Sequence, residues 1–250
     1  DRINLRDSLG KYLNRYLDSI KRDLQLKELL THQAGLTAWI PFYRYTLNDQ
    51  GFCDSNYCYR PNSFYSMQVA EDLYLQRGYR DSIWRTIAES EMHERGSYNY
   101  SDLGFFYLKK VIEQFLDRPF RQYARQEFFR PLGMNRTVFK PLEQFPLSRI
   151  VPTEDDDYFR HQLVHGYVHD PAAAMLGGVA GHAGLFSTTH DFAKLMQMLL
   201  NEGAYGGKRY FDPATVQLFT SQQYEDNRKG LGFDKPEPDT SKVSPTGELA

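Results

Sequence analysis

Residues 98–108 read Tyr-Asn-Tyr-Ser-Asp-Leu-Gly-Phe-Phe-Tyr-Leu, a polar turn that leads directly into an apolar helical pattern. A phenol (Tyr100), a hydroxyl (Ser101) and a carboxylate (Asp102) therefore lie where a loop becomes a helix. Backbone N–H groups at a helix start lack intrahelical partners, and the local field favours negative charge. The turn could hold acid–base groups beside a substrate. Ser and Asp are also ordinary helix caps, so the pattern alone favours a capped helix.

Apolar residues recur at helical spacing on both sides of this turn, with glycines and prolines between the periodic segments. Gly35 and Gly78 can end helices in a left-handed conformation, and Pro119 and Pro213 suit first helical turns. Ser187 or Thr188 can cap the helix that follows them. The pattern predicts a helix-dominated chain with few strands. The predicted helices span residues 5–20, 26–32, 66–77, 80–90, 103–115, 119–129, 191–200 and a short segment from 213.

Three stretches lack a helical period and read as loops. Residues 39–61 form a long loop, and such loops are usually functional or mobile. Residues 139–170 are irregular, and their acidic run 154–157 is typical of a solvated surface. Four glycines within residues 177–184 are incompatible with a stable helix and favour a tight turn close to other backbone.

The composition is that of an ordinary globular protein, with 41% hydrophobic and 25% charged residues among 250 and a net charge of −2. No basic run indicates a nucleic-acid or membrane-surface partner. No apolar run approaches the roughly 20 residues that a membrane span needs. The chain opens with charged residues and no signal peptide. We therefore expect residues 1–250 to be a partial domain.

Two groups of residues could carry other chemistry. Cys53 and Cys58 could close a small disulfide ring or remain free thiols, and no second cysteine pair completes a zinc site. His161, His165 and His169 would share one face of a helix and could bind a metal there. Glycine and β-branched residues between them favour an extended path instead, so the sequence predicts no metal site.

Serine nucleophiles need a neighbouring base, and the Gly-x-Ser-x-Gly elbow is absent from the chain. Ser-x-x-Lys occurs once, at residues 8–11, where a lysine lies one helical turn after a serine. This pair lies within an exposed amphipathic pattern and has Gly10 between its members. We interpret it as a chance match.

Several segments, taken in order, resemble the serine β-lactamase and penicillin-binding-protein-like superfamily in its class C and esterase-like branch. This branch includes envelope serine hydrolases of Bacteroides-type bacteria that are sometimes fused to a glycoside hydrolase domain. The resembling segments are Leu-Leu-Thr-His-Gln-Ala-Gly-Leu (29–36), Tyr-Ser-Asp-Leu-Gly (100–104), Phe-Arg-Pro-Leu-Gly-Met (129–134), Val-His-Asp (168–170) and Gly-Gly-Val-Ala-Gly-His-Ala-Gly-Leu-Phe-Ser-Thr (177–188).

The resemblance implies an α+β fold of the β-lactamase/transpeptidase type, of which this chain holds mainly the helical subdomain. It implies hydrolysis or acyl transfer through an acyl-enzyme, on cell-wall-related peptides or other ester, amide or lactam substrates, without a cofactor. Tyr100 corresponds to the proton shuttle of the second catalytic motif. Asp102 replaces the usual asparagine, and a carboxylate can accept hydrogen bonds but not donate them. Ser101, His182 and Gly184 are expected to line the pocket.

The resemblance also implies that the nucleophilic Ser-x-x-Lys precedes Asp1 and that the third motif follows Ala250. Residues 245–247, Pro-Thr-Gly, lack the basic residue of that motif. The 250 residues alone would then be inactive, and the complete protein would be a periplasmic or cell-envelope enzyme. A non-catalytic binding module with the same fold is the alternative, and a histidine-based metallohydrolase is a more distant one.

Overall fold

The computed structural model describes residues 3–13, 15, 17–51, 53–225 and 227–236. Tyr16 of the predicted first helix and the Pro-Thr-Gly at 245–247 lie outside this part. The helices are α1 (Leu9–Tyr12), α2 (Leu26–Leu30), α3 (Tyr79–Glu89), α4 (Leu103–Leu116), α5 (Phe120–Ala124, continued by a π-helical turn, Arg125–Phe129), α6 (Pro171–Met175), α7 (Thr189–Leu200) and α8 (Pro213–Thr220). The strands are β1 (Tyr57–Cys58), β2 (Tyr65–Ala70), β3 (Leu73–Gln76), β4 (Val138–Phe139), β5 (Pro152–Asp156), β6 (Gln162–His165), β7 (Leu185–Phe186), β8 (Ala204–Tyr205) and β9 (Lys208–Arg209).

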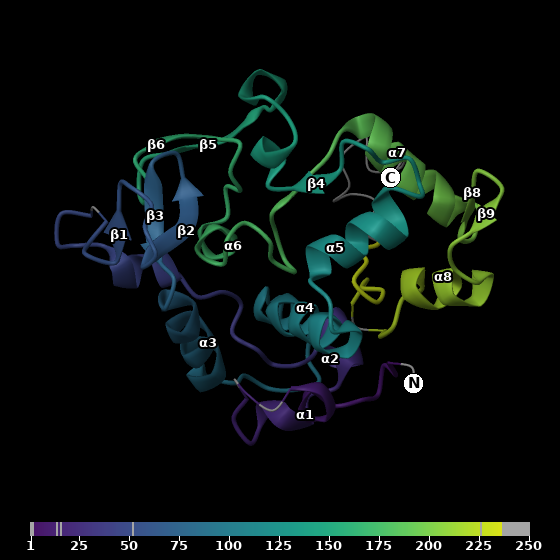
Figure 1. The fold of residues 1–250 in the computed structure, drawn as a ribbon. Coiled ribbons are helices and arrows are strands. Elements are labelled where there is room, and N and C mark those ends of the chain that lie inside the picture. Colours follow the sequence, from purple (N-terminus) through teal and green to yellow (C-terminus); the bar gives the residue numbers. More distant parts are fainter. Residues whose placement is uncertain (1–2, 14, 16, 52, 226, 237–250) are drawn as a thin grey trace.

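Helix α4 lies in the middle of the molecule, with α2 and α1 beside it (Figure 1). Its apolar residues Leu103, Phe106, Tyr107 and Val111 are buried, as their helical spacing predicts. Gly104 allows α2 to approach closely, because a Cβ there would lie 3.3 Å from the carbonyl oxygen of Leu29. The start of α4 is therefore held tightly against the core.

The strands form small antiparallel sheets in the described part of the chain. One sheet has the order β1-β3-β2, and the pairs β4–β7, β5–β6 and β8–β9 make the others. Short strands around larger helices give an α+β architecture dominated by helices, as the sequence predicted.

The prediction of a helix over residues 5–20 is wrong. Within the described residues of this stretch, only Leu9–Tyr12 is α-helical. The N–H of Leu9 donates to the carbonyl of Leu24 at 2.9 Å, and the N–H of Leu26 donates to the carbonyl of Asp7 at 3.0 Å. The chain folds back on itself, so hydrogen bonds between distant residues replace those of a continuing helix.

The prediction of a helix over residues 66–77 is also wrong, because β2 and β3 form a hairpin there. The two strands are joined at residues 71–72, where Asp72 adopts a left-handed conformation with φ 49°. In β3 the buried side chains of Leu73 and Leu75 lie two residues apart, as a strand requires. Short apolar segments of this kind fit a strand as well as they fit the helical pattern predicted there.

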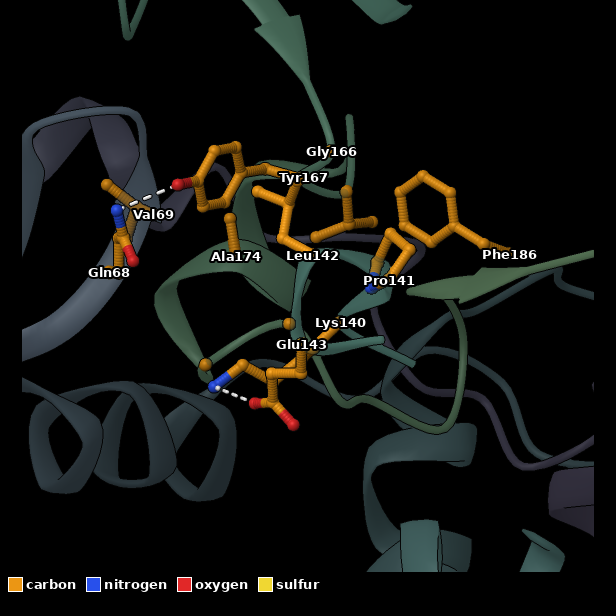
Figure 2. A pocket seen from close by; sticks show the side chains of 13 residues that line it. Gln68, Val69, Lys140, Pro141, Leu142, Glu143, Gly166, Tyr167, Ala174 and Phe186 are labelled. Carbon is orange, nitrogen blue, oxygen red and sulfur yellow. Dashed lines mark hydrogen bonds and ion pairs between the residues drawn. The ribbon is translucent and has the colours of Figure 1, made fainter. Parts of the chain in front are cut away.

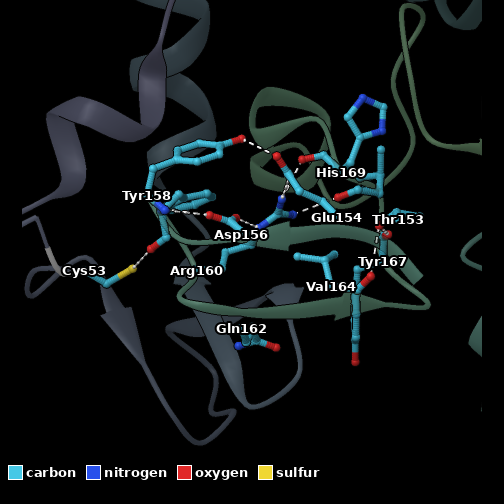
Figure 3. Close-up of polar contacts among 12 residues, drawn as sticks. Cys53, Thr153, Glu154, Asp156, Tyr158, Arg160, Gln162, Val164, Tyr167 and His169 are labelled. Carbon is cyan, nitrogen blue, oxygen red and sulfur yellow. Dashed lines mark hydrogen bonds and ion pairs between the residues drawn. The ribbon is translucent and has the colours of Figure 1, made fainter.

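Residues 139–170 are more ordered than predicted, because β5 and β6 form a hairpin within them. Figure 3 shows the reason: the Arg160 guanidinium donates to Asp156 at 2.5 Å, Glu154 at 3.0 Å and the Val168 carbonyl at 2.8 Å. It also donates to the carbonyl of His169 at 2.5 Å. Arg160 and Asp156 have fully buried side chains, so the acidic run is not simply a solvated surface. A buried charge needs such partners.

The other helix predictions are confirmed near residues 26–32, 80–90, 103–115 and 119–129, and after Thr188 and Asp212. The Thr188 hydroxyl caps α7 by accepting from the N–H of Asp191 at 3.3 Å. Residues 177–184 contain no helix, as their glycine content predicted.

His161 and His165 have backbone partners, and the two cysteines are not paired with each other. His165 is in β6 and its Nε2 lies 2.5 Å from the carbonyl oxygen of Ile150, while Nε2 of His161 lies 3.0 Å from that of Gly51. The strand confirms the extended path predicted between these histidines. Cys53 and Cys58 are free thiols. Within the described residues, none of the helices is long and apolar enough to cross a bilayer.

An open groove of about 830 Å³ runs between α2, α4 and α8. Most of its lining is apolar, and it includes one side of α4. Its apolar side chains are Ile3, Leu5, Leu26, Leu30, Phe105, Leu108, Val111, Ile112, Phe120, Leu218 and Phe219.

Candidate active site

The Tyr-Ser-Asp turn stands at the N-terminus of α4, with Asp102 at the N-cap. The Tyr100 hydroxyl donates to Oδ1 of Asp102 at 3.0 Å. The Asp102 side chain makes no capping hydrogen bond to α4. Instead, the Ser101 hydroxyl accepts from the N–H of Leu103 at 3.2 Å. The serine therefore supports the helix start, and the carboxylate is left to contact the phenol.

Tyr100 is the exposed member of this turn, with 52% of its surface accessible, whereas Ser101 is buried. Partial burial and the negative charge of Asp102, which accepts a hydrogen bond from the phenol, raise the pKa of Tyr100 to about 12. The phenol is therefore protonated near neutral pH. It could act as a base there only if a cation came close enough to oppose these two effects.

Residues 32–38 form the platform on which this turn rests. The Ser101 hydroxyl donates to the carbonyl of Thr37 at 2.6 Å, and the N–H of Asp102 donates to the carbonyl of Ala38 at 2.9 Å. The side-chain amide of Asn99 donates to the carbonyl of Leu36 at 2.8 Å. Gly35 is required nearby, because it has φ 67° and a Cβ there would lie 2.5 Å from the His93 carbonyl oxygen. Two segments more than 60 residues apart thus form one unit.

His32 belongs to the same platform and contacts the turn directly. Its Nδ1 accepts from the N–H of Ser101 at 3.1 Å, and its ring stacks on Tyr100 with centroids 4.5 Å apart. Burial, followed by the positive charge of Lys229, lowers the pKa of His32 to about 4. The ring is therefore neutral at neutral pH, and Nδ1 is an acceptor while Nε2 carries the hydrogen.

His182 lies on the other side of the α4 start and is paired with Asp170. Its Nε2 is 2.9 Å from Oδ1 of Asp170, and its ring stacks on Phe106 at 4.2 Å and 8°. The His182 side chain is 4% exposed. Burial would raise the pKa of Asp170, but the His182 bond and charge and the N–H of Ala173 outweigh it and hold that pKa below its ordinary value. The pair is thus a fixed carboxylate–imidazole contact.

A pocket of about 30 Å³ joins these two arrangements. Asp102 and His182 both line it, together with Asp170 and the side chain of Trp39. Tyr100, Ser101 and Gly184 are not among its lining residues, and Tyr100 reaches this region through its hydrogen bond to Asp102. Gly184 lies in a buried turn with φ 106°, where a Cβ would come within 2.6 Å of the Gly178 carbonyl oxygen. The structure therefore brings Tyr100, Asp102 and His182 to one region and gives Ser101 and Gly184 positions in the framework.

A larger pocket, of about 210 Å³, lies beside the glycine-rich segment (Figure 2). Tyr167 and Gln68 form one wall, where the Gln68 amide donates to the Tyr167 hydroxyl at 2.8 Å. The ion pair between Lys140 and Glu143, at 3.4 Å, borders the opposite side. These walls come from β2, from the loop after β6 and from the turn after β4, and none of the Tyr-Ser-Asp residues lines this pocket.

Sequence reasoning missed the contacts of His32 and Asp170 with the site. Both residues were inside segments that resembled the family, at 29–36 and 168–170, so the signal was present. Their spacing gave no indication of a partner, because Ser101 is 69 residues from His32.

Comparisons with known proteins agree with this architecture. The family described as Beta-lactamase matches residues 1–240. A protein of Escherichia coli (strain K12) named "Putative D-alanyl-D-alanine carboxypeptidase" is 35% identical over 248 residues, which cover 91% of this chain and 51% of that protein. Its namesake in Salmonella typhimurium (strain LT2) is 33% identical, over 93% of this chain and 53% of that protein. The chain spans about half the length of these curated relatives.

Solved structures share the fold at low sequence identity. The octameric penicillin-binding protein homologue from Pyrococcus abyssi has a TM-score of 0.58 and 18% identity, covering 92% of this chain and 47% of that one. The D-amino acid amidase from Ochrobactrum anthropi SV3, complexed with L-phenylalanine amide, has a TM-score of 0.59 and 15% identity, covering 93% and 59%. Likeness at this level of identity is a likeness of fold.

Proposed function

This chain belongs to the beta-lactamase family, and from that premise we propose that it supplies the acid–base residues of a serine hydrolase or acyltransferase that works through an acyl-enzyme. The observation that carries the proposal is the Tyr100 phenol, exposed at the start of α4 and hydrogen-bonded at 3.0 Å to Asp102. Tyr100 is the proton shuttle in this proposal, and Asp102 is the carboxylate that positions a cation beside it.

The chemistry follows from the charges at the turn. A lysine ammonium placed between the phenol oxygen and Asp102 would form an ion pair with the carboxylate. Its positive charge would also lower the pKa of Tyr100. The phenolate could then accept the proton of a serine hydroxyl as that oxygen attacks a carbonyl carbon. The same proton passes to the leaving oxygen or nitrogen as its bond to the carbonyl breaks, which yields the acyl-enzyme. Water attacks the ester in the second half of the reaction, with Tyr100 again transferring the proton.

The serine and lysine of this proposal belong to a Ser-x-x-Lys that precedes Asp1 in the complete protein. The matched relatives are about twice as long as this chain, so they leave room for such a segment outside the matched part. Their name, D-alanyl-D-alanine carboxypeptidase, supports a cell-wall-related peptide as the substrate. Another ester or amide as the substrate, and the periplasm or cell envelope as the location, belong to the same proposal. A coding sequence without Ser-x-x-Lys before Asp1 would contradict the enzymatic role.

The test is covalent labelling of the complete protein by a fluorophosphonate or a penicillin probe. We expect Tyr100→Phe to lower the acylation rate at least ~100-fold, the scale of general acid–base catalysis. Tyr98→Phe is the matched control, because it removes a neighbouring phenol that makes no hydrogen bond to Asp102, and it should label at the wild-type rate. An unchanged labelling rate for Tyr100→Phe would exclude the shuttle role.

The second candidate is a non-catalytic binding module with the same fold. The departure from the family pattern at Asp102 favours it, because a carboxylate cannot donate to a substrate carbonyl as the amide of asparagine does. Saturable binding of a cell-wall peptide without covalent labelling of the wild-type protein would support this candidate. Labelling of the wild-type protein would exclude it.

A further inference from the structure

We propose that His32 is a positioning residue for Tyr100, holding the phenol at its working position through the Ser101 backbone and through the face of its own ring. This inference rests on the proposed function, because it assumes that Tyr100 transfers the proton. His32 contacts neither the Tyr100 hydroxyl nor Asp102 by a hydrogen bond. Its influence would pass entirely through the turn that carries them.

The first support is the hydrogen bonding between His32 and the turn. Nδ1 accepts from the buried N–H of Ser101 at 3.1 Å, and the His32 carbonyl accepts from the N–H of Asn99 at 2.8 Å. Tyr100 lies between these two residues, so both neighbouring amides are tied to one histidine. A buried N–H without an acceptor is costly, and the turn would rearrange to find another.

The second support is the conformation and packing of the histidine itself. His32 adopts φ 58°, a left-handed conformation in which histidine, asparagine and aspartate are enriched among non-glycine residues. Three aromatic rings surround the His32 ring. The Tyr98 ring meets it edge on, with centroids 6.0 Å apart, and the Tyr100 ring stacks on it at 4.5 Å. The ring of Phe105, in α4, lies 5.7 Å away. The ring is thus enclosed by aromatic residues on either side of Ser101.

The third support is electrostatic, because the contact requires a neutral ring. Lys229 and Asp234, from the segment after α8, act on His32 with opposite signs. Tyr98, Tyr100 and Asp102 are the titratable groups of the turn. Burial, followed by Lys229, disfavours the protonated ring. A protonated Nδ1 would be a donor facing the Ser101 N–H, and the hydrogen bond would be lost.

The experiment compares His32→Asn with His32→Leu in the complete protein. Asparagine tolerates the left-handed conformation and can place Oδ1 near the position of Nδ1, whereas leucine fills space but accepts no hydrogen bond. We expect His32→Leu to lower the rate constant for acylation by about 10–100-fold, which is the effect expected of a misplaced catalytic group. Probe affinity should change little.

His32→Asn should recover most of the acylation rate that His32→Leu loses. His190→Leu, at an exposed position of α7, is the matched control and should react as the wild type does.

Backbone hydrogen exchange at Ser101 gives a readout that is independent of activity. The amide should exchange slowly in the wild type and in His32→Asn, and faster in His32→Leu. All rates are measured below the unfolding transition of each variant, so that loss of folding is not mistaken for loss of position. If His32→Leu is destabilised, His32→Asn still tests the proposal by its recovered rate and its protected amide.

The outcomes separate this inference from the proposed function. If Tyr100→Phe slows labelling but His32→Leu labels at the wild-type rate, the positioning role is refuted and the shuttle stands. If neither variant slows labelling, the proposed function itself fails. A folded His32→Asn that labels as slowly as His32→Leu would also refute the role of the Nδ1 acceptor.

Discussion

Lowering the pH from 7 to 4 should destabilise the folded protein through His32. The pKa of this residue is about 4 in the folded protein, against an ordinary value of 6.5. Between these two values the unfolded chain binds a proton that the folded chain does not bind. The stabilising contribution of neutral His32 is therefore fully present above pH 6.5 and is lost as the pH falls towards 4.

The magnitude follows from the same two values. The interval from 6.5 to about 4, at about 1.4 kcal/mol for each pH unit, corresponds to about 3 kcal/mol of unfolding free energy. His32 is only 7% exposed, so solvent screening reduces this figure little. The loss is about a fifth to three fifths of the stability of an ordinary domain, which is about 5–15 kcal/mol.

The assay is urea unfolding of the wild type and of His32→Asn at several values between pH 7 and pH 4. Carboxylates titrate in both proteins, so their effects largely cancel in the difference between the two unfolding free energies. Between pH 7 and pH 4, we expect the wild type to lose about 3 kcal/mol more unfolding free energy than His32→Asn loses. His190→Asn, exposed on α7, should follow the wild type at every pH. Equal pH dependence of the wild type and His32→Asn would refute the reasoning.

Three other residues give predictions that circular dichroism melting or thiol labelling can check. Gly181→Ala should cost about 2–4 kcal/mol, because its Cβ would lie 2.1 Å from a carbonyl oxygen of α4, whereas Gly78→Ala has open space and should be nearly neutral. Arg160→Leu should cost about 3–5 kcal/mol, because it leaves the buried Asp156 carboxylate without its partner, and a loss below about 1 kcal/mol would contradict that pairing. Burial raises the pKa of the Cys53 thiol to about 12, so iodoacetamide at pH 8 should alkylate it at least ~100-fold more slowly than free cysteine, and equal rates would show an accessible thiolate.

The elements that the sequence predicted well are those with local signals. Helix α4 follows from apolar residues three and four positions apart, and the start of α7 follows from the Thr188 cap. Both depend on contacts within one or two helical turns. The predicted helix at 5–20 failed because residues some 15 positions or more further along the chain supplied other hydrogen-bond partners there. The one at 66–77 failed because the two halves of that segment pair with each other as the hairpin of β2 and β3. Apolar spacing is ambiguous in short segments, and the pairing of one strand with another then decides between helix and strand.

By itself, the sequence determined the family resemblance, the helical character of the chain, and the position of Tyr100 and Asp102 at the start of α4. Only the tertiary structure decided what surrounds them. His32 approaches Ser101 across 69 residues, and His182 meets Asp170 behind the same helix. A hydrogen bond between such residues depends on how whole elements pack, since nothing in the local pattern of either segment specifies its partner. The protonation states of His32 and Tyr100 depend on that packing too, because burial and nearby charge arise only when the chain is folded.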